Sequence, residues 1–400
     1  MSKSSSNAML KSAIKILSIV AGGSVLLIGS AIALNWTYLR RVVTHPEKII
    51  TQVDWYKPLA KVQGNPSTFT VSETKTIPTE SIAKISAYAQ AHNSASLLVL
   101  HKGKLVSESY WRGFKPSSTS NSMSMSKTVV ALLIGIAIEE GHIDSELDTV
   151  AKYIPEWSED EHSKITLQDL LYMHSGLRNE DKTTNLSSDL VRMYMGKDVN
   201  RIALNIPALT SSQKDFDYNN VNTQILGEVL ERATGEKYVD YLSTRLWKPL
   251  QASDAGLWLD RPQGNPKIFC CMFATGQDWL KIGQLFIDQG KVNQKQVVSS
   301  AWLDKMVQAS PIESTYGYHI WLEAKTENKP GGITRRSSQP FVSPDTVYLD
   351  GKSLQRVYII PAYDLVVVRI GEKSEKWDDS IIPNTLVNSL KNQRTTATNN

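Results

Sequence analysis

The sequence is poor in the residues that build disulfide-stapled or metal-bound scaffolds. Its 400 residues contain only two cysteines, which are adjacent at Cys270 and Cys271. Two cysteines exclude a disulfide framework and a cysteine-rich zinc module. Adjacent cysteines rarely bond to each other, so we expect two free, buried thiols. No two of the seven histidines have the spacing of three or four residues typical of metal ligands, so we predict no metal site and no cofactor.

Other recognisable kinds of site are missing as well. No glycine-rich loop opens a helix in the manner of a phosphate-binding loop, and the Gly-x-Ser-x-Gly elbow of α/β-hydrolases is absent. The net charge is only +4 and the basic residues are dispersed, which predicts no nucleic-acid partner. With 41% hydrophobic and 21% charged residues, the composition is that of an ordinary globular protein.

The N-terminus departs from this average. Residues 16–34 carry no charge and would span about 28 Å as a helix, close to the thickness of a bilayer core. Lysines precede the run, and Trp36 and Tyr38 follow it where an interfacial aromatic belt would lie. We predict that residues 1–45 anchor the chain in the inner membrane through 16–34, with the body in the periplasm or outside. The alternative is a signal peptide cleaved after the small-residue site at 31–33, which would release the body into the periplasm.

The rest of the chain is predicted to be a linker followed by one domain. Residues 46–80 contain four prolines and many hydroxyl residues, typical of a linker. Residues 81–395 are expected to form the domain, with a mainly helical insert at about 145–265. Hydrophobic patterning predicts helices at 79–92, 124–140, 221–234 and 380–391, and strands at 96–101, 105–111, 316–323, 346–350, 355–360 and 365–370. Strands from both ends of the chain indicate an α+β fold, in which helices flank an antiparallel sheet.

The first candidate for chemistry is a Ser-x-x-Lys motif. The chain contains five such motifs, but only the one at Ser124 and Lys127 opens a strongly apolar helix. The spacing puts both side chains on one helical face. A buried lysine that loses its proton can accept the proton of a nucleophilic serine. The alternative is a serine that caps the helix beside a lysine whose amine reaches water.

The second candidate is Tyr218-Asn219-Asn220, the only Tyr-x-Asn in the chain, just before a predicted helix. A phenol beside a lysine can relay protons, and the amide of Asn220 can orient the lysine or a substrate. The alternative is a capping asparagine beside a packed tyrosine.

Together these motifs resemble those of the serine β-lactamase-related hydrolases, of the class C β-lactamase and DD-peptidase type. Within them the likeness is to the 6-aminohexanoate-dimer hydrolase group. It extends from about residue 80 to 375. Besides Ser124-Met-Ser-Lys127 and Tyr218-Asn-Asn220, it includes Tyr153-Ile-Pro-Glu156, Met173-His-Ser-Gly-Leu177, Leu246-Trp-Lys-Pro-Leu250, Phe269-Cys-Cys271, Tyr316-Gly-Tyr318 and Tyr358-Ile-Ile-Pro361.

The resemblance implies a β-lactamase/transpeptidase-like fold with Ser124 as nucleophile and Lys127 with Tyr218 as the general-base pair. Asn220 would orient Lys127 or the substrate. The family's third motif corresponds in order to Lys352-Ser353-Leu354, where Leu354 replaces the usual glycine. A side chain there would narrow the cleft, and the amide of Gln355 is then a candidate oxyanion donor.

Three functions remain open on the sequence alone. The leading one is a serine hydrolase that cleaves a small amide or ester through a Ser124 acyl-enzyme, similar to the 6-aminohexanoate-dimer hydrolases. The second is a DD-peptidase or β-lactamase that acts on cell-wall peptides or β-lactams. The third is a penicillin-fold binding protein without turnover. The oligomeric state is left open.

Overall fold

The computed structural model describes residues 35–181, 184–209 and 215–398. The predicted membrane span at 16–34 lies outside the described residues. Among the residues that are described, no helix combines the length and the apolar character that crossing a membrane requires.

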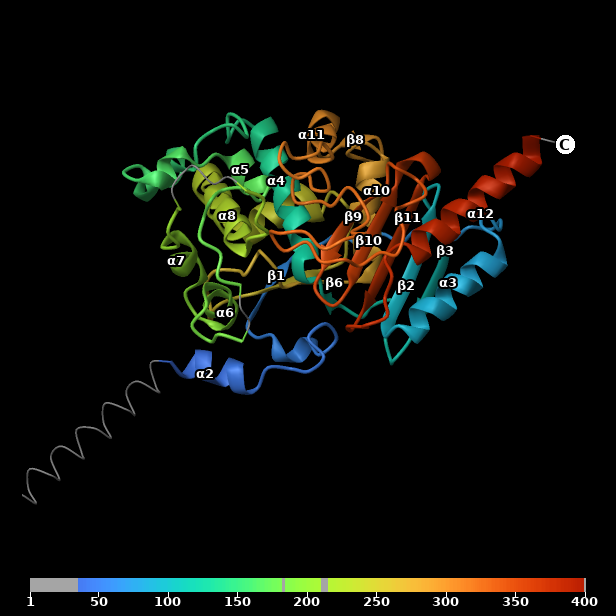
Figure 1. The fold of residues 1–400 in the computed structure, drawn as a ribbon, viewed down its shortest axis with the longest axis horizontal. Coiled ribbons are helices and arrows are strands. Elements are labelled where there is room, and N and C mark those ends of the chain that lie inside the picture. Colours follow the sequence, from blue (N-terminus) through green and yellow to red (C-terminus); the bar gives the residue numbers. More distant parts are fainter. Residues whose placement is uncertain (1–34, 182–183, 210–214, 399–400) are drawn as a thin grey trace, which may run out of the picture.

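The central element is a five-stranded sheet built from both ends of the chain (Figure 1). Its order is β3-β2-β11-β10-β9, and every neighbouring pair is antiparallel. The strands are β2 (Ser94–His101), β3 (Lys104–Tyr110), β9 (Val347–Gly351), β10 (Gln355–Ile360) and β11 (Leu365–Gly371). The predicted α+β architecture with an antiparallel sheet is therefore confirmed.

The two faces of this sheet pack against different helices. Alternate residues such as Leu97, Val99 and Val367 lie in the core beneath α3 (Thr79–Ala91) and α12 (Ile381–Thr398). Their neighbours along the strands, including Leu98 and Val366, lie in the larger core with α10 (Gly276–Ile287). The period-two alternation of a strand thus gives two apolar faces, so the sheet is buried on both sides.

One predicted strand is wrong. Residues 316–323 form only isolated bridges, between Tyr316 and Trp321 and between Trp321 and Tyr348. The chain turns at His319, whose φ is +53°. Tyr316 and Trp321 instead pack edge to face, with ring centroids 4.6 Å apart. The apolar residues of 316–323 therefore pack in an aromatic cluster and do not pair as a strand of a sheet.

The segment 46–80, expected as a linker, packs onto the body. Its strand β1 (Leu59–Val62) pairs with β5 (Ala255–Trp258) in a second sheet of order β1-β5-β6-β4, whose other strands are β6 (Met272–Ala274) and β4 (Ser120–Asn121). Ile50 and Tyr56 are fully buried in the large core. The prolines therefore do not mark a free tether here, because backbone pairing and apolar burial hold the segment in place.

The region of the predicted insert is mainly helical and lies to one side of the central sheet (Figure 1). It contains α5 (Leu167–Leu171), α6 (Asp189–Met195), α7 (Val199–Leu204), α8 (Asn220–Thr234) and α9 (Tyr238–Tyr241), with several single helical turns. The remaining elements are α2 (Trp36–Val43), α4 (Ser126–Glu139), α11 (Ser300–Met306) and the β7–β8 hairpin (Lys291–Val292, Lys295–Gln296). The division of the chain into anchor, linker and domain stays a prediction.

The two cysteines are not free thiols. The structure joins Cys270 and Cys271 in a disulfide, so that expectation is wrong. Both residues are buried, and Cys271 has a left-handed φ of +70°. This backbone conformation turns the two neighbouring side chains toward each other, which an extended chain does not do.

Close packing of α10 on the sheet depends on Gly283. A Cβ at this position would lie 2.3 Å from Val366 Cγ1 and 3.2 Å from Val357 Cγ1. We expect Gly283→Ala to lower the free energy of unfolding by about 1–3 kcal/mol, because overpacking outweighs the higher helix propensity of alanine. Urea denaturation measures this change. Ala87→Val, which adds carbons at an exposed position of α3, should change stability by only about 0.5 kcal/mol. Equal effects of the two substitutions would contradict the close contact.

Candidate active site

Ser124 lies in the turn that leads into α4. This turn, Met123–Met125, is a 3-10 helix, and α4 itself begins at Ser126. Met123 has a φ of +49°, and its amide donates to Asn121 Oδ1 at 3.0 Å. Ser124 is half-buried, whereas its neighbours are buried. The turn therefore presents this serine to the cavity while α4 enters the core.

Lys127 is buried on the first turn of α4 and points back toward Ser124. It is 1% exposed. Its Nζ lies 3.3 Å from Ser124 Oγ, 2.8 Å from Asn220 Oδ1 and 2.6 Å from the backbone oxygen of Phe269. No carboxylate contacts the amine directly among the residues that the structure describes. The lysine is thus held by neutral oxygens in an apolar surrounding.

Burial sets the protonation state of Lys127. Loss of hydration lowers its pKa to about 7, and the more distant charge of Asp350 opposes this shift. Asp350 has limited influence because it is itself paired, with Lys325 Nζ at 2.5 Å and with Arg356 Nη1. The amine is therefore available as a base near neutral pH, which a surface lysine is not.

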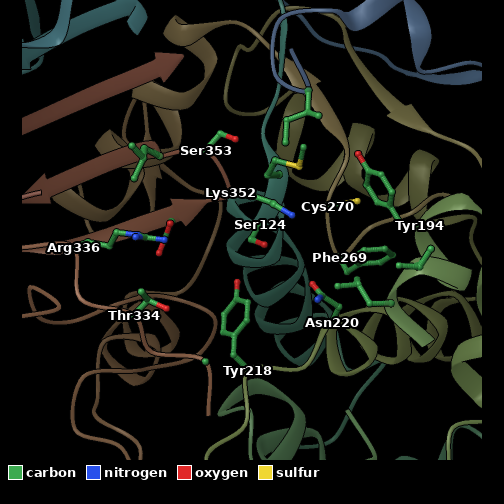
Figure 2. Close-up of a pocket in the computed structure, with 18 of the residues that line it drawn as sticks. Ser124, Tyr194, Tyr218, Asn220, Phe269, Cys270, Thr334, Arg336, Lys352 and Ser353 are labelled. Atoms are coloured by element: carbon green, nitrogen blue, oxygen red, sulfur yellow. The ribbon is translucent and has the colours of Figure 1, made fainter. Parts of the chain in front are cut away.

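Tyr218 precedes α8, and its hydroxyl points toward the same serine, as Figure 2 shows. Burial raises the pKa of its phenol above the ordinary range, and a hydrogen bond with Ser124 partly opposes that shift. Its ring stacks on Trp321, with centroids 5.8 Å apart and an interplanar angle of 26°. The phenol is therefore held protonated, so it can donate a proton or a hydrogen bond but is a poor free base.

The two asparagines of the Tyr-x-Asn motif lie at the start of α8 and make different contacts. Asn219 caps the helix, because its Oδ1 accepts from the amide of Val221 at 3.0 Å. Asn220 is the first residue of the helix and turns its amide oxygen to Lys127. The structure thus brings Ser124, Lys127, Tyr218 and Asn220 together around one point.

Ser124, Tyr218 and Asn220 line a cavity of about 530 Å³ that has two unlike walls. One wall is polar and includes Lys325, Arg336 and Asp350. The other is largely apolar and comes from the N-terminal segment, α6 and the Phe269 turn: Val42, Ile49, Leu186, Leu190, Val191, Tyr194, Met195 and Phe269. Figure 2 shows Arg336 and Tyr194 on opposite sides of Ser124. The cavity is therefore suited to a substrate with one polar and one apolar end.

The structure places the predicted third motif, Lys352-Ser353-Leu354, at this cavity, but not Gln355 that follows it. Lys352 is exposed and lines it, as do Ser353 and Leu354. Gln355 does not line it, because its side chain is buried and bonds the backbone of Gly371 in both directions. The structure thus assigns the side chain of Gln355 to holding β10 against β11.

Leu354 adopts a conformation that normally requires glycine. Ser353 and Leu354 have φ values of +63° and +72°. Such left-handed residues cost roughly 1 kcal/mol or more each. Arg369 Nη1 donates to the carbonyl oxygens of both residues at 2.9 Å, which holds the turn. The Leu354 side chain is 6% exposed and occupies part of the cavity wall.

Several residues at the site escaped the sequence reasoning. The backbone oxygen of Phe269 carries no side-chain signal, and Asp350 and Arg336 lie in stretches without a motif. In the polar loop 326–344, Gly332, Thr334 and Arg336 line the cavity. His174 and His319 do not line it: they contact Asp169 and Thr223 at 3.1 and 3.0 Å.

Comparisons with known proteins agree on the type of fold. The family model described as Beta-lactamase matches residues 80–383. The 6-aminohexanoate-dimer hydrolase of Paenarthrobacter ureafaciens is 28% identical over 299 residues, which are 71% of this chain and 73% of that protein. A structure from Bacillus anthracis, provisionally named a 6-aminohexanoate-dimer hydrolase, has a TM-score of 0.66 at 19% identity and covers 91% of this chain and 93% of its own. A class C beta-lactamase from Rhodobacter sphaeroides has a TM-score of 0.56 at 14% identity, covering 80% and 100%.

The Leu354 side chain should limit the size of group that reaches Ser124. We expect Leu354→Gly to raise the rate of labelling by a bulky fluorophosphonate by about tenfold or more relative to a small one, because even one methylene in a pocket changes discrimination by about 10–200-fold. Competitive labelling followed by mass spectrometry measures the ratio.

Leu390→Ala is the matched control for this prediction, because Leu390 is also 6% exposed in the same core but does not line the cavity. It should lower stability without changing the labelling ratio. An unchanged ratio in Leu354→Gly would show that another group limits access.

Proposed function

This chain belongs to the beta-lactamase family and is a serine hydrolase, and we propose that it cleaves an amide or ester through an acyl-enzyme formed at Ser124. The observation that supports the proposal most is the contact of the buried, weakly basic Lys127 with Ser124 at 3.3 Å. A serine hydroxyl is a poor nucleophile until a neighbouring base accepts its proton.

Acylation uses the three side chains in turn. Lys127 accepts the Ser124 proton while Oγ bonds to the substrate carbonyl carbon. The bond to the amine or alcohol then breaks, and that group leaves with a proton donated by Tyr218. Lys127 returns its proton to Tyr218, which restores the phenol. The contacts of Asn220 and the Phe269 carbonyl keep the lysine directed at Ser124 throughout.

Deacylation reverses the same proton path. A water molecule gives its proton to Lys127 and adds to the acyl carbon, and the carbon–Oγ bond breaks as Ser124 regains a proton. The developing oxyanion lies near the N-terminal end of α4, where the partial positive charge of the helix stabilises it.

A second candidate function is a DD-peptidase or β-lactamase activity. The observation in its favour is that two exposed cations, Lys352 and Arg336, line the cavity, which suits a carboxylate-bearing substrate. Leu354 weighs against β-lactams, because it fills space at the end of β9. Release of D-alanine from a pentapeptide, compared with turnover of simple amides and esters, separates the two.

We also propose that residues 16–34 tether the hydrolase to the inner membrane with its body on the periplasmic side. The uncharged run and the aromatic residues after it support this placement. Fractionation of the full chain tests it: recovery with soluble periplasmic proteins would instead favour cleavage of a signal peptide.

Ser124→Ala should abolish covalent labelling by a fluorophosphonate and lower hydrolysis of p-nitrophenyl acetate by about a thousandfold or more, because the nucleophile is lost. The matched control is Ser126→Ala, on the same turn, whose hydroxyl is buried and bonds the Ile268 carbonyl at 2.8 Å. Labelling should survive in the control. Labelling that persists in Ser124→Ala would contradict the assignment, and single labelling without turnover would favour a binding protein.

The pH dependence of kcat/KM should reflect the titration of Lys127. We expect kcat/KM to rise with pH and level off with a midpoint near 7, because the amine is a base only after its proton leaves. The raised pKa of Tyr218 keeps the phenol protonated over this range.

Asp350→Asn should move the midpoint to lower pH. It removes the negative charge that raises the Lys127 pKa, and it leaves Lys325 without its carboxylate partner nearby. A midpoint that stays in place or moves upward in a variant with an unchanged circular dichroism spectrum would contradict the role of Lys127.

A further inference from the structure

The short helix α2 presents its apolar face to the outside. Trp36, Leu39 and Val43 are 59%, 38% and 82% exposed. Their spacing of three and four residues puts them on one helical face. A surface helix of a globular protein normally turns this face to the core. The helix α2 therefore has the reverse orientation, with its apolar face exposed.

The opposite side of α2 fixes this orientation. Arg41 is 2% exposed, and its Nη1 donates to the Gly196 carbonyl at 2.7 Å and to the Met195 carbonyl at 3.2 Å. Its guanidinium lies 4.7 Å from the centre of the Trp258 ring. A buried cation with these partners cannot turn outward without losing its hydrogen bonds. The apolar face of α2 is thus held outward.

The exposed apolar surface continues into the cavity. Tyr38 on α2 donates its hydroxyl hydrogen to the Leu186 carbonyl, and Leu186 is 54% exposed. We call Trp36, Leu39, Val43 and Leu186 the α2 face. Leu186 also lines the cavity at Ser124, as does Val42 of α2. Leu186 and Val42 therefore connect the α2 face to the apolar wall of the cavity at Ser124.

The sequence around α2 indicates what covers this face. The uncharged run 16–34 ends two residues before Trp36, so whatever apolar phase holds that run also lies next to α2. Arg40 and Arg192 are exposed beside the face, and cations next to an apolar helix face attract anionic lipid head groups. Figure 1 shows α2 along one edge of the molecule, next to α6. A lipid surface matches both the charge and the position.

We propose that the α2 face rests on an anionic lipid bilayer, and that the apolar wall of the cavity takes up the hydrocarbon chain of an ester or amide amphiphile from that bilayer. This inference rests on the proposed function, both the Ser124 chemistry and the tether. The scissile carbonyl lies at Ser124, and the polar end of the amphiphile faces Arg336 and Lys352. Water is the second reactant, and the products are a long-chain carboxylate and the released alcohol or amine.

The test compares two substrates in the full chain reconstituted into vesicles of phosphatidylglycerol and phosphatidylethanolamine. One is p-nitrophenyl acetate, which is soluble, and the other is p-nitrophenyl palmitate embedded in the vesicles. In the triple variant Trp36→Ser, Leu39→Ser and Val43→Ser, we expect palmitate hydrolysis to fall by about tenfold and acetate hydrolysis to stay unchanged, because only uptake from the bilayer depends on the face.

The matched control replaces three exposed apolar residues elsewhere. Val71, Leu147 and Ile312 are 66%, 60% and 47% exposed, and none of them lines the cavity. Their combined substitution by serine should leave both rates unchanged. An equal loss of palmitate hydrolysis in both triple variants, or no loss in the α2 variant, would overturn the proposal. Acetate hydrolysis that is absent in the unaltered chain would overturn the proposed function itself.

Contact with the bilayer has a direct readout as well. Both cysteines are joined in a disulfide, so Val43→Cys adds a single free thiol for a fluorescent label. In the same vesicles we expect lipid-borne nitroxides to quench a label at Val43→Cys and to spare one at Leu147→Cys. Equal quenching at the two positions would overturn the proposed docking, even if the tether holds the chain at the membrane.

Discussion

The site depends on a lysine that is buried without a carboxylate in contact. Lys127 is surrounded by the oxygens of Ser124, Asn220 and Phe269, three neutral groups. A carboxylate in that position would hold the proton on the amine, and an open surface would hydrate it. Only the combination of burial and neutral acceptors gives a base near pH 7. The buried helix α4 keeps water from the amine, and the start of α8 and the Phe269 turn supply two of its neutral acceptors.

Charges around the site are arranged so that they nearly cancel. Asp350 is paired with Lys325 and Arg356, and Arg356 also bonds Asp379 at 2.8 Å. Lys325 in turn lies over the ring of Trp321, which stacks on Tyr218. This network connects the sheet to Tyr218. Because its members are buried, removal of one partner would leave another charge uncompensated, which is far more costly than the loss of a surface pair.

Much of the fold, and the pairing of Ser124 with Lys127, could be predicted from the local pattern of apolar and polar residues. The strands β2, β10 and β11 follow alternating or continuous apolar runs, and the apolar helix after Ser124 identifies one Ser-x-x-Lys among five. The strand expected at 316–323 failed because apolar periodicity does not distinguish a ladder from an aromatic cluster. The segment 46–80, expected as a linker, packs on the body because a few buried side chains and one paired strand outweigh the local preference of prolines for irregular chain.

The sequence by itself determined that Ser124 and Lys127 lie close together, because a spacing of three residues places both on one helical face. It also determined that an apolar N-terminal run precedes the body. The tertiary structure alone decided that the Phe269 carbonyl holds the lysine, that Gln355 turns away from the cavity and that the α2 face continues into it. The contact of Lys127 with Phe269 joins residues 142 apart, and Arg41 of α2 reaches Leu259 over 218 residues. Contacts at such separation depend on packing rather than on local pattern.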